Sequence, residues 1–129
     1  EHILSPDQLI THVMLPSAEG LANATYEVRQ SEGPDYPLAA AAAALRIEGG
    51  VVRQASIVLG HVAPTPWLSP EAERALVGRV VNHETARAAG EAAVSSATPL
   101  SDNVYKVQLA RVAAERAILL AAGIETGGF

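Results

Sequence analysis

Four polar side chains that lie close together in the sequence form its best candidate for a binding site. Tyr26 and Arg29 precede the loop 31–37, and Asp35 and Tyr36 lie within it. An Arg and an Asp beside two aromatic rings can hydrogen-bond to a planar heterocycle and flank its faces. The alternative is a solvated loop in which Tyr36 covers the hydrophobic core.

The usual catalytic and metal-binding patterns do not occur in the sequence. The histidines His2, His12, His61 and His83 lie far apart, and none has a partner at the spacing of a metal site. The chain has no cysteine, which excludes disulfides, thiolate ligands and iron–sulfur ligation by its own side chains. Nucleophile-elbow, P-loop and dinucleotide-binding glycine patterns are also missing. We predict no catalytic residue and no metal site in this chain.

Length and composition predict one domain, residues 1–129, with neither a nucleic-acid partner nor a membrane span. The formal net charge is −5, and the nine Lys and Arg residues are scattered along the chain. The longest apolar run, 38–45, is far shorter than the ~20 residues that cross a bilayer. The start carries no secretory signal pattern, so we expect a cytoplasmic protein. The missing initial Met suggests a fragment of a longer chain.

The elements that must position the polar cluster change in type halfway along the chain. Strand patterns fill the first half, at 9–15, at 24–30 and in a hairpin of 38–47 with 51–59. Helical patterns fill the second half. This segregation predicts an α+β fold, an antiparallel sheet of three or four strands with about three helices packed on one face.

The alanine run 39–44 is the difficult part of this assignment. Alanine has the highest intrinsic helix propensity, so local preference favours a helix. The alternation that follows the run and the pair Gly49-Gly50, which can supply the positive φ angles of a tight turn, favour a hairpin. We predict the hairpin. Its small side chains leave room for a helix or a neighbouring domain close above the strand.

Capping residues predict where the helices begin and end. Ser69 and Asn82 are predicted to cap helices 70–77 and 84–97, and Ser101 or Asp102 to cap a last helix, 103–122, that Gly123 ends. Trp67 is predicted to fill the seam between the sheet and the first helix, and Arg116 to pair with a carboxylate. The positions of the last helix predicted to face the sheet are Leu109, Val112, Ala113, Leu119 and Leu120.

Three phrases in fixed order carry a resemblance to a known family. They are ATYEVRQ (24–30) running into GPDYPLAA (33–40), LGHVAPTP (59–66), and SDNVYKVQL (101–109) leading to ERAI (115–118). Together with the entry segment 5–16, they resemble the C-terminal domain of the FAD-binding subunit of molybdenum hydroxylases, the family of xanthine dehydrogenase and carbon monoxide dehydrogenase. No single phrase is a catalytic signature, and the specificity lies in their order and spacing.

The resemblance implies a supporting role in an oxidoreductase. In such subunits electrons pass from a molybdenum cofactor through two 2Fe-2S clusters, both on partner subunits, to FAD. The N-terminal FAD-binding domains hold the pyrophosphate, and this domain would cover the flavin and dock the iron–sulfur and molybdopterin subunits, inactive by itself. The resemblance also implies that the loop carrying Asp35 and Tyr36 approaches the isoalloxazine side of the FAD pocket.

The sequence departs from the family pattern at two places. Glu27-Val28 stands where a Lys commonly follows the Tyr, and Lys106-Val107 replaces two arginines near the start of the last helix. A single Lys does not reproduce the bidentate pairing of a guanidinium. Two other functions remain open from the residues: an assembly module without flavin contact, and a self-standing binder of a small molecule.

Overall fold

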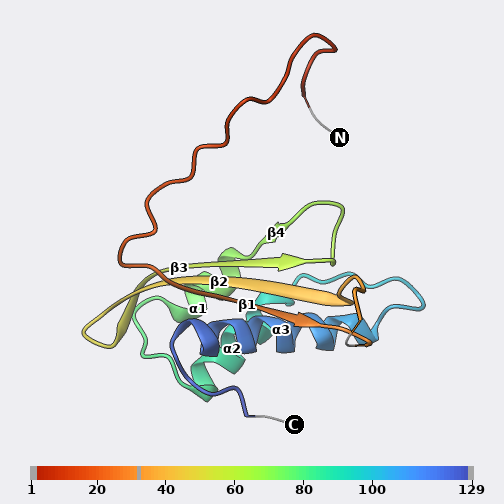
Figure 1. The fold of residues 1–129 in the computed structure, drawn as a ribbon. Coiled ribbons are helices and arrows are strands. Elements are labelled where there is room, and N and C mark those ends of the chain that lie inside the picture. Colours follow the sequence, from red (N-terminus) through yellow and green to blue (C-terminus); the bar gives the residue numbers. More distant parts are fainter. Residues whose placement is uncertain (1–2, 32, 128–129) are drawn as a thin grey trace.

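The computed structural model describes residues 3–31 and 33–127, which form a four-stranded antiparallel sheet followed by three helices. The strands pair in sequence order, β1-β2-β3-β4. All three helices lie on one face of the sheet (Figure 1). The predicted α+β class and arrangement are confirmed. The elements are β1 (Ala22–Val28), β2 (Ala39–Glu48), β3 (Val51–Gly60), β4 (Trp67–Leu68), α1 (Pro70–Leu76), α2 (His83–Ala93) and α3 (Tyr105–Ala121).

The alanine run is a strand, as the hairpin hypothesis predicted. Gly49 and Gly50 have φ angles of 58° and 79°, the pair of positive values that a two-residue hairpin turn needs. Along β2 the buried residues alternate with partly exposed ones, as a strand with one covered face requires. The helix propensity of alanine is therefore overridden, because β2 is the strand on which α3 packs.

Small side chains bring α3 close to the sheet. Its buried face is a stripe of alanines at helical spacing with Ile118 and Leu119, and it faces Ala39, Ala41 and Ala43 of β2. Alanine on both sides lets a helix and a strand approach more closely than large side chains would allow. The helical alanines in this stripe are Ala110, Ala113, Ala114, Ala117 and Ala121.

A glycine allows α2 to lie close to α3. A Cβ placed on Gly90 would lie 2.7 Å from the carbonyl oxygen of Arg111 and 3.4 Å from Glu115. The first of these distances is too short for any side chain. Gly90 is therefore required by the packing of the two helices.

The helix boundaries match the prediction at α1 and differ at the other two helices. Ser69 caps α1, and Asn82 forms a reciprocal capping box with Thr85 at the start of α2. The helix α2 ends at Ala93 instead of continuing to residue 97. Neither Ser101 nor Asp102 caps α3, since Val104 occupies that position without a side-chain bond.

The predictions for two side chains and for one strand were also wrong. Leu120 is 42% exposed and does not face the sheet. Trp67 is 46% exposed on the short edge strand β4 and does not fill a core seam. Residues 9–15 form no strand: the segment before β1 is irregular, exposes its apolar side chains and runs away from the domain (Figure 1).

No helix within the described residues is long and apolar enough to span a bilayer.

Candidate functional site

Tyr26 lies on the face of β1 that the helices cover. Its phenol oxygen accepts a hydrogen bond from Arg116 of α3, whose guanidinium carbon lies 5.1 Å from the ring centroid. A cation over an aromatic ring combined with a hydrogen bond ties β1 to α3. The side chain of Tyr26 is therefore part of the contact between the sheet and the helices, and Arg116 has a phenol as a partner.

Arg29 lies just after β1 and pairs with Glu27 on the same strand. The distance from its Nε to the carboxylate oxygen Oε2 is 2.9 Å, and both side chains are about two-fifths exposed, at 42% and 41%. A pair this exposed contributes little to stability. The Glu27 that replaces the family's lysine is thus the partner of Arg29.

Asp35 and Tyr36 belong to the loop between β1 and β2. The backbone N–H of Leu38 donates to the carbonyl of Val28 at 2.8 Å, which closes the loop at its base. Tyr36 is 84% exposed, so the alternative in which it covers the core is wrong. Its ring lies 6.4 Å from the ring of His61, tilted by 50°.

The structure therefore divides the four predicted site residues into two groups. Tyr26 faces the helices, whereas Arg29, Asp35 and Tyr36 are exposed at the end of the sheet where the β1–β2 loop lies. Among the described residues, no hydrogen bond or ion pair joins any two of the four. The loop gains a neighbour that the sequence did not predict, His61, which has a positive φ of 61° in the turn after β3.

On the sheet face opposite the helices, β2 presents a run of small side chains, Ala40, Ala42 and Ala44. One row of paired residues crosses all four strands on this face, Thr25 with Ala42, Ala42 with Val58, and Val58 with Leu68. A shallow hollow lies over Thr25, Ala42 and Val58 of this row and over their neighbours Ala40 and Gly60. We call this surface the open face, and it includes Ala44 and Ser56 in the next row.

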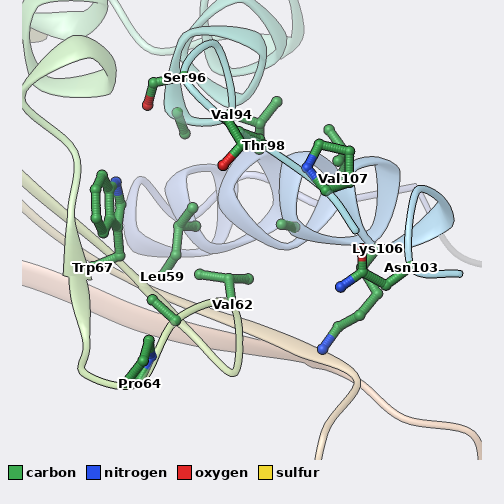
Figure 2. A pocket seen from close by; sticks show the side chains of 15 residues that line it. Leu59, Val62, Pro64, Trp67, Val94, Ser96, Thr98, Asn103, Lys106 and Val107 are labelled. Carbon is green, nitrogen blue, oxygen red and sulfur yellow. The ribbon is translucent and has the colours of Figure 1, made fainter. Parts of the chain in front are cut away.

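A pocket that the sequence analysis missed lies beside the turn after β3 (Figure 2). Trp67 and Lys106 line it, although the sequence placed the first in the core and treated the second as a weakened arginine site. The Nζ of Lys106 donates to the carbonyl of His61 at 2.9 Å. Lys106 and His61 are far apart in the sequence, so this contact could be found only from the folded structure.

The described residues fit part of a flavin site and not the whole of one. Phosphate groups are usually held by a glycine-rich loop that leads into a helix N-terminus. Here the paired glycines 49 and 50 connect two strands, and α1 and α2 begin with capping side chains and acidic first turns. The helix α3 begins without a cap, but the connection before it, 94–104, contains no glycine. The open face, by contrast, has small side chains that would allow a planar group to approach. Between residues 3 and 127, the described part of the chain has a surface that could cover a flavin ring and no glycine-rich cradle for a pyrophosphate.

Comparison with known proteins identifies the class of this domain. Residues 24–121 match the family model described as the CO dehydrogenase flavoprotein C-terminal domain. The chain belongs to this family, the C-terminal domains of the FAD-binding subunits of molybdenum hydroxylases. The resemblance carried by the three sequence phrases is confirmed.

Individual relatives support the same assignment. The chain is 32% identical over 119 residues to the carbon monoxide dehydrogenase medium chain of Afipia carboxidovorans, covering 89% of this chain and 41% of that one. Quinoline 2-oxidoreductase from Pseudomonas putida 86 matches with a TM-score of 0.75 and 34% identity, over 80% of this chain and 37% of that chain.

Carbon monoxide dehydrogenase from Hydrogenophaga pseudoflava matches with a TM-score of 0.74 and 32% identity, over 83% of this chain and 38% of that one. This chain therefore spans about two-fifths of the length of the relatives that it matches.

Proposed function

We propose that this domain covers the flavin of an FAD-binding subunit and helps to dock the iron–sulfur and molybdopterin subunits of a molybdenum-containing hydroxylase or dehydrogenase. FAD, held mainly by N-terminal domains, would accept electrons that leave the molybdenum cofactor through 2Fe-2S clusters on partner subunits. The observation that carries the proposal is the open face, where β2 presents small side chains that no helix within the described residues covers.

An uncovered sheet face of this composition favours a close neighbour. Ala40, Ala42 and Ala44 project on the side of β2 away from α3, and each is partly exposed. A planar ring or a domain surface can approach the backbone over alanine more closely than over leucine or phenylalanine. Burial of these three alanines against a neighbour would add hydrophobic stabilisation that the described residues alone do not provide.

The segment before β1 supports an embedded position for the domain. Most of its large apolar side chains are exposed, among them Leu9 at 83% and Met14 at 93%. Exposed apolar residues gathered in one segment are typical of a contact with another protein surface. In the proposed assembly, this segment would lie against the N-terminal FAD-binding domains.

The exposed loop residues would adjust the flavin without carrying the redox step. Arg29, Asp35 and Tyr36 offer a cation, a carboxylate and a phenol at one end of the sheet. Such groups near a flavin change its potential through charge and hydrogen bonding. Tyr26 would act differently, through its contact with Arg116 and the position of β1.

The loop variants Asp35→Ala and Tyr36→Ala test this proposal in the full subunit complex. Each is expected to change the flavin reduction potential or the turnover with the electron acceptor, and to leave the thermal midpoint almost unchanged, because both side chains are exposed. Tyr105→Ala removes another exposed tyrosine, from the start of α3, and serves as the control. Wild-type potential and turnover in both loop variants would contradict the flavin contact and favour an assembly module.

A further inference from the structure

The pocket beside the turn after β3 has one apolar side and one cationic side. It has a volume of about 290 Å³ and lies between that turn, the connection from α2 to α3, and the first turns of α3. Figure 2 shows Trp67 at one side of the pocket and Lys106 at the other, with Leu59 and Val62 between them. The apolar side is completed by Pro64 and Val94.

The polar groups that line this pocket are suited to an anion. Its lining contains Lys106, Asn103, Ser96 and Thr98 and includes no Asp or Glu. The ammonium of Lys106 uses one hydrogen for the carbonyl of His61, so two remain for a ligand. The amide oxygen of Asn103 accepts from the backbone N–H of Leu100 at 2.7 Å, which leaves its NH₂ group to donate.

The start of α3 adds to this preference for negative charge. The first turn of α3 contains no acidic residue, and no side chain caps it. The N-terminal end of a helix of this length carries partial positive charge, and the acidic residue nearest to it in the sequence, Asp102, lies outside the helix, two residues before the N-cap Val104. The chain as a whole is acidic, with a net charge of −5, whereas the pocket lining has Lys106 as its charged residue.

We propose that this pocket binds a small aromatic carboxylate. The ring would lie against Trp67, Leu59 and Val62, and the carboxylate would accept hydrogen bonds from Lys106 and Asn103. The volume is near the lower end of the ~300–1,000 Å³ typical of small-molecule sites, which suits a ligand of one or two rings. The site would be separate from the proposed flavin surface, since its walls are the helix side of the sheet edge and the loops around it.

The composition of the chain provides a direct reporter for this proposal. Trp67 is the only tryptophan and Lys106 the only lysine in the sequence. The single indole N–H resonance of the ¹⁵N-labelled 129-residue chain therefore reports on the pocket without further assignment. We expect 1-naphthoate to shift this resonance, and to bind about tenfold more tightly than neutral 1-naphthamide, because a charge-assisted hydrogen bond is lost with the amide.

Two variants of Lys106 separate recognition from loop structure. Lys106→Met should weaken naphthoate binding about tenfold and remove the preference over the amide, whereas Lys106→Arg should retain both, because it keeps the cation. Arg53→Met removes the same charge from an exposed residue near the β2–β3 turn and should leave affinity unchanged.

Three results would overturn the proposal. The first is the absence of a shift at Trp67 with naphthoate. The second is equal affinity for the acid and the amide in the wild-type chain. The third is a response of Trp67 to an acidic peptide and none to naphthoate, which would assign the pocket to a segment of a partner protein instead of a small ligand.

Discussion

The two faces of β2 are both built from alanine, but one face is buried beneath α3 and the other is partly exposed. Ala39, Ala41 and Ala43 are at most 3% exposed beneath α3. Ala40, Ala42 and Ala44 alternate with them along the strand and remain partly exposed on the open face. A run of identical side chains thus produces one surface that the chain completes by itself and one that it leaves uncovered.

The covered face of β2 contributes to the stability of the domain itself, and the open face is available for contact with another domain. The covered face gains from α3, which presents alanines of its own and two large side chains, Ile118 and Leu119. The open face gains nothing of this kind within the described residues. Changes on the covered face should therefore alter unfolding, and changes on the open face should alter association with the flavin-bearing domains.

The largest effect is expected from truncation of Ile118, which is fully buried. Ile118→Ala should lower the free energy of unfolding by about 2–5 kcal/mol, because it leaves a cavity between α3 and the sheet. Leu120→Ala on the same helix removes a side chain that is 42% exposed and should cost much less. Urea titration of both variants measures the difference, and equal losses would mean that the buried face of α3 is wrongly assigned.

Enlargement of the covered face should come next. Ala41→Leu adds three carbons where Ala41 is 3% exposed under α3, and overpacking of this kind costs about 1–3 kcal/mol. Ala42→Leu adds the same atoms one residue further along, on the open face, and should change the free energy of unfolding by less than about 0.5 kcal/mol. Similar costs in denaturant titrations would remove the distinction between the two faces.

The close approach of α2 to α3 predicts a smaller loss at Gly90. Gly90→Ala would gain up to about 1 kcal/mol of helix propensity but would force the helices apart, since its Cβ would lie 2.7 Å from a backbone oxygen. We expect a net loss of about 1–2 kcal/mol from this overpacking. Gly33→Ala, in the exposed loop and without such a contact, is the control. A stabilised Gly90→Ala variant by thermal melting would show that the helices can separate freely.

The smallest effect is expected at the contact between β1 and α3. Tyr26→Phe keeps the ring beneath Arg116 and removes only the hydroxyl that accepts its hydrogen bond. The loss should be about 0.5–1.5 kcal/mol in a denaturant titration. The reduction potential of the flavin in the full subunit should stay unchanged. A shifted potential with unchanged stability would instead indicate that Tyr26 contacts the flavin, as the sequence suggested.

The sequence was sufficient for the hairpin and for two of the three helix starts. Gly49-Gly50, Ser69 and Asn82 act through local backbone geometry, which short-range patterns encode directly. The start of α3 was missed because Ser101 and Asp102 both resemble caps, whereas the helix begins only at Tyr105, after Val104. Several candidates in a row make such a boundary uncertain.

The candidate site was harder to predict because it depends on contacts between distant parts of the chain. Tyr26 contacts Arg116, and the ring of Tyr36 lies near the ring of His61. In both pairs the two residues are far apart in the sequence. Trp67 was placed in the core on the grounds of residue type, but β4 is only two residues long and leaves it at the sheet edge. The apolar pattern at 9–15 predicted a strand, and the described residues contain no strand that pairs with it.

We propose that the flavin-bearing part of the subunit covers the open face. The substitution Ala42→Arg tests it most directly, because Ala42 lies in the row that crosses all four strands. The 129-residue chain should keep its thermal midpoint, while the full-length subunit with this change should lose bound FAD, measured as the ratio of flavin to protein absorbance. A full-length variant with wild-type flavin content and an unchanged melting temperature would contradict the claim.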